Sequence, residues 1–126
     1  SGAYRLQEAA GPERVTLLAT GSEVAIAAET RALLEKQGIG AAVVSMPCWA
    51  LFDQLTREEQ AAILPEGTLK VAIEAGSSLG WHRYTGRDGL VCALDHFGAS
   101  APYQELYRHF DLTAAAIGAK ILAKLG

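Results

Sequence analysis

The chain has 126 residues, half of them hydrophobic, and a formal net charge of −3. This length suits one globular domain with its own core, and the apolar content excludes a disordered chain. No cluster of Lys and Arg marks a nucleic-acid surface, and no apolar run approaches the ~20 residues of a membrane span. Two distant cysteines, Cys48 and Cys92, and an N-terminus without an apolar leader lead us to expect a cytoplasmic protein.

The predicted elements alternate between strand and helix. Residues 1–14 read as an irregular lead-in, and residues 15–126 as the domain. Strands separated by helical segments require crossovers, so we expect a mostly parallel sheet with helices on both faces. Within the Gly-rich connection 76–89 we expect one helical turn around Trp81–Tyr84. A buried strand is predicted over Val15–Ala19, and further strands over Ala41–Met46, Leu69–Ala75 and Leu90–Leu94. Helices are predicted over Glu23–Gln37, Thr56–Ile63, Ala101–Phe110 and Thr113–Leu125.

The first strand leads directly into a polar turn, Thr20–Gly21–Ser22. Parallel sheets bind ligands at their carboxyl edge, and free amides at a helix start attract anions, so Thr20, Gly21 and Ser22 are the candidate anion-binding residues. Thr20 and Glu23 also have the spacing of a capping box, in which Glu23 would occupy those amides and repel an anion. No Lys or Arg follows, as a P-loop requires. We therefore favour structural capping over an anion site.

Other polar residues are expected at the same edge. Glu74 ends the third predicted strand, and Asp95 and His96 follow the fourth. A carboxylate or imidazole there could act as a general acid or base. Alternatively, it could be a polar residue that leaves the sheet for solvent, or one that holds loops and a partner domain together. We favour the non-catalytic interpretation because the spacing shows no matched acid–base pair. Thr56 and Glu59 repeat the capping-box spacing, which we interpret as a helix start only.

Histidine and cysteine spacing gives no support to a metal site. His82, His96 and His109 lack H-x-x-x-H or C-x-x-C spacing, so no metal ligand is predicted. Cys48 as a nucleophile would need a histidine brought close by the fold, and a buried or incidental thiol is the favoured interpretation. A Cys- or Ser-dependent hydrolase stays as a third hypothesis, although the chain has no G-x-S-x-G elbow.

Four aromatic residues lie outside the predicted core strands: Trp49, Phe52, Trp81 and Tyr84. Large rings in loops are often interface anchors. The alternative is that they pack within the domain.

Several short motifs follow one another in a characteristic order. They are ATGSEV (19–24), VVSMP (43–47) with Phe52-Asp53, ILP (63–65), AIEAG (72–76), GWHRYTG (80–86) and DHFGASAP (95–102). Together they closely resemble the C-terminal domain of transketolase, over nearly the whole chain. The resemblance implies a three-layer αβα domain with a mostly parallel sheet of about five strands.

What the resemblance implies about function is specific. Transketolases are homodimers that use thiamine diphosphate and a divalent metal (Mg or Ca) to move a two-carbon ketol unit between sugar phosphates. Their first two domains hold cofactor and substrate, and the third is largely structural. We therefore expect no catalytic, cofactor-binding or metal residue in this chain. The family's metal–diphosphate motif begins G-D-G and later needs an asparagine, whereas the nearest string is Gly86-Arg87-Asp88-Gly89 and the chain has no asparagine.

The partners expected from the resemblance are the remaining transketolase domains, with an apolar or aromatic surface patch where they pack. Related thiamine enzymes such as dihydroxyacetone synthase stay as alternatives. So does a free-standing α/β module that binds an anionic or nucleotide ligand at Thr20–Ser22.

Overall fold

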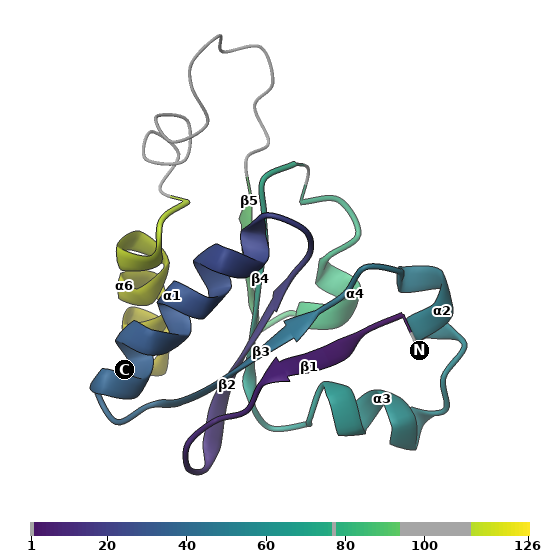
Figure 1. The fold of residues 1–126 in the computed structure, drawn as a ribbon, viewed down its shortest axis with the longest axis horizontal. Helices are drawn as coiled ribbons and strands as arrows, with labels where there is room; N and C mark the ends of the chain where they lie inside the picture. The colour runs from purple at the N-terminus through teal and green to yellow at the C-terminus, as the bar shows by residue number, and fades with distance from the viewer. Residues whose placement is uncertain (1, 77, 94–111) are drawn as a thin grey trace, which may run out of the picture.

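A computed structural model describes residues 2–76, 78–93 and 112–126. Its centre is a five-stranded sheet of order β1-β3-β2-β4-β5, in which β1 is antiparallel to β3 and the other pairs are parallel (Figure 1). The mostly parallel sheet predicted from the sequence is thereby confirmed. The strands are β1 (Tyr4–Gln7), β2 (Glu13–Ala19), β3 (Gly40–Ser45), β4 (Leu69–Glu74) and β5 (Leu90–Ala93).

Helices cover both faces of the sheet, as expected. In Figure 1, α1 and α6 lie together on one side, and α2, α3 and α4 lie on the other. The three-layer αβα architecture is therefore confirmed. The helices are α1 (Glu23–Lys36), α2 (Trp49–Asp53), α3 (Arg57–Ile63), α4 (His82–Thr85) and α6 (Ala114–Leu125).

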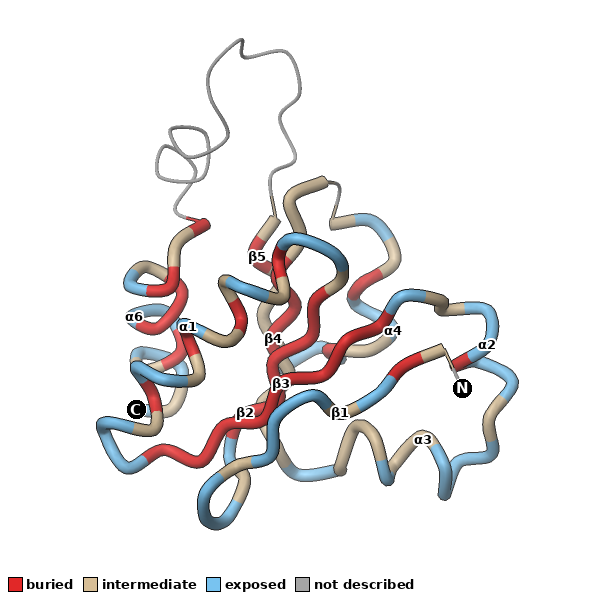
Figure 2. Tube along the Cα trace, viewed as in Figure 1, coloured by how far each residue is buried: buried red, intermediate tan, exposed pale blue. Residues whose placement is uncertain are grey.

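The central strand β2 has apolar side chains on both faces. Val15, Leu17 and Ala19 pack with α1 and α6 in one core cluster, whereas Leu18 packs in the other, toward α2 and α4. All four are fully buried. Because side chains alternate across a strand, a strand covered on both sides becomes a continuous apolar run. Figure 2 shows this as buried backbone through β2, β3 and β4.

Two predicted helix signals are confirmed. Gly38 ends α1 with a φ of +78°, and Ile39 N–H donates to Leu34 O at 3.0 Å, as in a glycine-terminated helix. The hydroxyl of Thr56 accepts from the backbone N–H of Glu59 at 3.1 Å, and the Glu59 carboxylate accepts from the Thr56 N–H at 2.9 Å. This reciprocal pair is the capping box expected at the start of α3.

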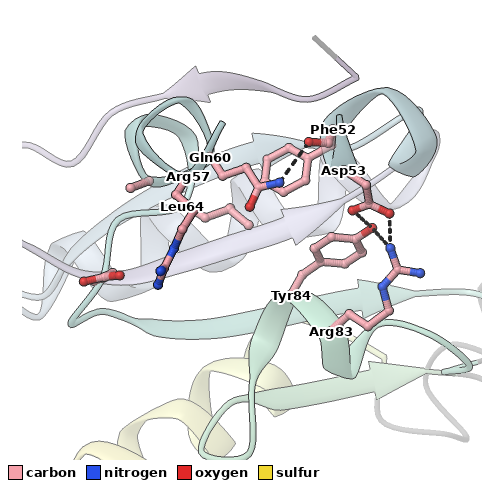
Figure 3. Close-up of a pocket in the computed structure, with 9 residues that line it drawn as sticks. Phe52, Asp53, Arg57, Gln60, Leu64, Arg83 and Tyr84 are labelled. Atoms are coloured by element: carbon pink, nitrogen blue, oxygen red, sulfur yellow. Dashed lines mark hydrogen bonds and ion pairs between the residues drawn. The ribbon is translucent and has the colours of Figure 1, made fainter. Parts of the chain in front are cut away.

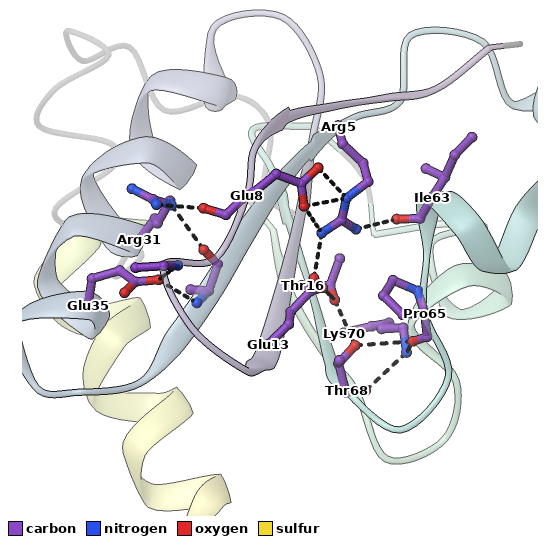
Figure 4. A network of polar contacts seen from close by, with 12 residues as sticks. Arg5, Glu8, Glu13, Thr16, Arg31, Glu35, Ile63, Pro65, Thr68 and Lys70 are labelled. Atoms are coloured by element: carbon purple, nitrogen blue, oxygen red, sulfur yellow. Dashed lines mark hydrogen bonds and ion pairs between the residues drawn. The ribbon is translucent and has the colours of Figure 1, made fainter.

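The irregular structure predicted for residues 1–14 is wrong over Tyr4–Gln7, which form the edge strand β1. Only the β3 side of β1 is paired, and three of its residues are exposed, so no buried apolar pattern marks it in the sequence. Polar contacts hold the segment in place (Figure 4). The Arg5 guanidinium donates to Ile63 O at 2.7 Å and contacts the carboxylates of Glu8 and Glu13.

The same network continues into the sheet. Thr16 is fully buried, and its hydroxyl donates to the Glu13 carboxylate at 2.6 Å and lies 2.6 Å from the Thr68 hydroxyl. Lys70 Nζ donates to Thr68 O at 3.1 Å and to Pro65 O. Burial lowers the pKa of Lys70. These bonds satisfy polar groups inside an otherwise apolar strand pair, as burial requires.

Two further differences concern helices. Helix α2 was not predicted, because a five-residue helix is too short to show a helical repeat in the sequence. The helix predicted over Ala101–Phe110 and the last strand residue, Leu94, lie outside the described residues.

Candidate functional site at the carboxyl edge of the sheet

The polar turn Thr20–Gly21–Ser22 connects the carboxyl end of β2 to α1, as predicted. The expected capping box is wrong: α1 begins after Ser22, which makes no side-chain cap bond. Glu23 N–H instead donates to the Thr20 carbonyl at 3.2 Å. The Glu23 carboxylate turns away toward the neighbouring strand, where it accepts from Ala75 N–H at 3.3 Å.

Glu23 and Glu74 together anchor the connection that follows β4. Ser22 Oγ donates to Glu23 Oε2 at 2.5 Å, and Glu23 is only 6% exposed. Glu74 Oε1 accepts from the Trp81 indole N–H at 2.9 Å, and its Oε2 accepts from Gly76 N–H at 2.9 Å. Of the two non-catalytic roles expected for Glu74, these bonds agree with the one in which it holds a loop. The role of Glu23 was not foreseen, since Ala75 is 52 residues away in the sequence.

A small pocket of about 230 Å³ opens between these elements. Among the described residues that line it, the one charged group is the Glu74 carboxylate, and none is a Lys or an Arg. Negative charge at this edge disfavours a phosphate or another anion. The lining residues are Thr20, Met46, Pro47, Trp49, Glu74 and Trp81.

The four aromatic residues pack against one another within the domain. The Trp49 ring lies 4.9 Å from Trp81 and 5.2 Å from Tyr84, and Phe52 lies 5.5 Å from Tyr84, all with steeply inclined planes. Trp81 and Phe52 are buried, whereas Trp49 is half-buried. Edge-to-face contacts of this kind stabilise the packing of α2 against α4.

Polar contacts among Asp53, Arg83 and Tyr84, called the clasp below, join the same two helices. Tyr84 Oη donates to Asp53 Oδ1 at 2.9 Å, and Arg83 pairs with the other carboxylate oxygen (Figure 3). The hydrogen bonds from Tyr84 and Arg83 lower the pKa of Asp53. Burial, together with the bond to Asp53, raises the pKa of Tyr84 to about 12. Apart from the Phe52-Asp53 and GWHRYTG motifs themselves, no pattern in the sequence predicts these contacts.

A second pocket, of about 300 Å³, lies beside this clasp. Phe52, Leu64 and Tyr84 contribute apolar lining to this pocket, and Arg57 lies beside Leu64 (Figure 3). Glu66 is among the lining residues as well. Charges of both signs therefore border it, and the pocket has no net preference for an anion or a cation.

The histidines and cysteines form no reaction centre in the described part of the chain. His82 is exposed at the start of α4, and His96 and His109, like Asp95, lie outside the described residues. Cys48 precedes α2 and is partly buried. Burial raises the pKa of the Cys92 thiol, which keeps it protonated.

The described residues also do not fit a metal–diphosphate group. No three His, Cys, Asp or Glu side chains among them are grouped to hold a metal ion. The Gly86–Gly89 string precedes β5, so it lies at the amino edge, opposite the Thr20 turn. Across residues 2–76, 78–93 and 112–126, no helix has both the length and the apolar character that a membrane span needs.

Comparison with known proteins gives the family. A family model described as the transketolase-like TK C-terminal domain matches residues 2–113. This chain belongs to that family. The transketolase of Halalkalibacterium halodurans is 46% identical over 125 residues, which cover 98% of this chain and 19% of the relative.

Solved structures agree with this membership of the transketolase-like family. The Pichia stipitis transketolase in complex with sedoheptulose-7-phosphate superimposes with a TM-score of 0.87 at 32% identity, over 98% of this chain and 18% of that one. A split-gene transketolase, solved as an inactive β4 tetramer, gives 0.69 at 28% identity, over 98% of this chain and 42% of that one. This chain thus spans about a fifth of the length of the first two transketolases.

Proposed function

We propose that this chain acts as the C-terminal domain of a transketolase. The whole protein would transfer a two-carbon ketol unit from a ketose phosphate to an aldose phosphate, with thiamine diphosphate and a divalent metal (Mg or Ca) as cofactors. It would be a cytoplasmic homodimer of the pentose phosphate pathway. The match of residues 2–113 to the transketolase-like C-terminal family supports this assignment.

Within that protein, the role of this domain is structural. One observation carries the proposal: both described carboxylates at the carboxyl edge, Glu23 and Glu74, accept hydrogen bonds from the connection that follows β4. Acidic groups committed to holding a loop are not available as acid–base catalysts. Cofactor and sugar phosphates would bind to other domains of the parent.

Activity assays test both parts of the proposal. The isolated chain, supplied with thiamine diphosphate, Mg²⁺ and a ketose–aldose phosphate pair, should give no turnover, whereas the full-length protein should. Turnover by the isolated chain would refute the structural role. An inactive full-length protein would refute the transketolase assignment.

The alternative is an α/β module that binds an anion or nucleotide at Thr20–Ser22. The carboxylates of Glu23 and Glu74 at this edge disfavour it. Calorimetry with inorganic phosphate and with a nucleoside triphosphate separates the two hypotheses, because heat of binding at millimolar ligand would favour the module.

A further inference from the structure

The pocket of about 300 Å³ beside the clasp is lined from three helices. Phe52 belongs to α2, Gln60 to α3 and Tyr84 to α4, so only the folded chain brings these side chains together. Small-molecule sites in proteins have volumes of roughly 300–1,000 Å³. The pocket lies at the lower end of that range, which suits a small metabolite.

One part of the lining is apolar and held in place. Phe52 is buried, Leu64 and Tyr84 are half-buried, and these three side chains are called the apolar wall below (Figure 3). The ring of Phe52 lies 5.5 Å from that of Tyr84, whose hydroxyl donates to Asp53 at 2.9 Å. A ligand would therefore meet side chains that are already ordered, so little conformational entropy is lost on binding.

Among the described residues, four charged side chains line this pocket, and two of them are already paired. Asp53 and Arg83 form the ion pair of the clasp. The other two, Arg57 and Glu66, are exposed. Within the described part of the chain, neither of these two side chains makes a hydrogen bond or an ion pair. One positive and one negative charge on the pocket are therefore left for a ligand.

Gln60 adds a neutral acceptor to the lining. Its side-chain N–H group donates to Phe52 O at 3.2 Å and to Leu55 O at 3.4 Å. Because both partners are carbonyl oxygens, the amide nitrogen must face them, which fixes the orientation of the amide. No described residue donates to the amide oxygen, so this oxygen can accept from an N–H group of a ligand.

The two unpaired charges select the charge type of the ligand. A phosphorylated compound brings about two negative charges, whereas Arg57 is the one unpaired cation in the described lining. A simple alkylammonium ion would balance Glu66 but leave Arg57 without an anion. A zwitterion brings one charge of each sign and satisfies both groups.

We infer that this pocket binds a free α-amino acid with an apolar side chain. Arg57 pairs with the α-carboxylate, Glu66 and the Gln60 oxygen accept from the ammonium group, and the apolar wall packs against the side chain. The inference goes beyond the proposed function, which gives this domain no ligand. Because both charged groups are exposed, we expect a modest affinity, with a Kd of about 1 mM.

Isothermal titration calorimetry of the full-length protein with L-leucine tests the site. Two analogues each lack one charge: 4-methylpentanoate has no ammonium group, and 3-methylbutylamine has no carboxylate. We expect each analogue to bind about 10-fold more weakly than L-leucine, because one charged group of the pocket then has no partner.

Substitutions of exposed residues show whether the binding occurs in this pocket. Arg57→Gln and Glu66→Gln should each weaken L-leucine binding about 10-fold. Arg87→Gln and Glu58→Gln are the matched controls, since both residues are exposed and neither lines the pocket, and they should leave the Kd unchanged.

Three results would overturn the inference. The first is the absence of binding heat at about 10 mM L-leucine. The second is a Kd that Arg57→Gln and Glu66→Gln leave unchanged, which would place the amino acid at another site. The third is an analogue that binds as tightly as L-leucine, which would show that the site does not recognise a zwitterion.

Discussion

Replacement of Glu74 by glutamine tests how the carboxyl edge is held. Both carboxylate oxygens accept a hydrogen bond, one from the Trp81 indole and one from Gly76 N–H, each at 2.9 Å. Glutamine has a single acceptor oxygen, so its amino group must face the other donor. A lost bond to a charged acceptor costs ~1.5–3 kcal/mol. We expect Glu74→Gln to lower the free energy of unfolding by about 2 kcal/mol, or Tm by roughly 6–10 °C at this chain length.

Urea unfolding followed by far-UV circular dichroism measures this loss. Glu58→Gln is the matched control, since Glu58 is exposed on α3, and its effect should stay within about 0.5 kcal/mol. In a Trp81→Phe background the glutamine amide can turn its oxygen toward Gly76, so Glu74→Gln should then cost less than about 1 kcal/mol. If Glu74→Gln is as stable as the parent chain, or if its cost is unchanged by Trp81→Phe, Glu74 does not hold the connection through these two bonds.

Three other perturbations probe the cap, the core and the clasp. Thr56→Ala removes the N-cap acceptor of α3 and should cost about 1 kcal/mol in urea unfolding; an unchanged midpoint would contradict the capping box. Leu17→Ala empties a fully buried position and should cost ~3–5 kcal/mol, whereas Leu6→Ala on the exposed edge should cost below about 0.5 kcal/mol; equal losses would contradict the assigned burial. The pKa of Tyr84 is about 12 in the folded chain, against 10.0 for a free phenol. The stability that Tyr84 contributes is therefore fully present below pH 10, and it is lost as the pH rises through 12. Absorbance titration should show one tyrosine that ionises well above pH 10, and Asp53→Asn should lower its pKa. A pKa that Asp53→Asn leaves unchanged would show that the bond to Asp53 does not raise the pKa of Tyr84.

Local sequence patterns were sufficient to predict the elements that are long and buried. The runs at Val15–Ala19 and Ala41–Met46 predicted β2 and β3 because strands covered on both faces are continuously apolar. The Thr56–Glu59 pair predicted a cap because both partners lie within one helical turn. The edge strand at Tyr4–Gln7 escaped prediction because its stabilising bonds, such as Arg5 to Ile63 O, join residues 58 positions apart.

In the candidate site, too, some features could be predicted from the sequence and others could not. The sequence placed Thr20 and Glu74 at one edge of a parallel sheet, because each follows a predicted strand. It did not reveal that the Glu23 carboxylate would accept a hydrogen bond from Ala75 N–H instead of capping α1. That choice depends on β4 lying beside β2, which follows from the sheet order rather than from any local pattern.

The amino-acid sequence was enough to predict the alternation of strands and helices, the end of α1 at Gly38 and the resemblance to the transketolase C-terminal domain. These features depend on periodicity and on short motifs, which survive without knowledge of the fold. Three other features become visible only in the folded chain: which carboxylates hold the connection after β4, how α2 packs on α4, and which leucines remain on the surface. Each of these features depends on contacts between segments far apart in the sequence. The partner of a polar group is set there by which strand ends the sheet brings together.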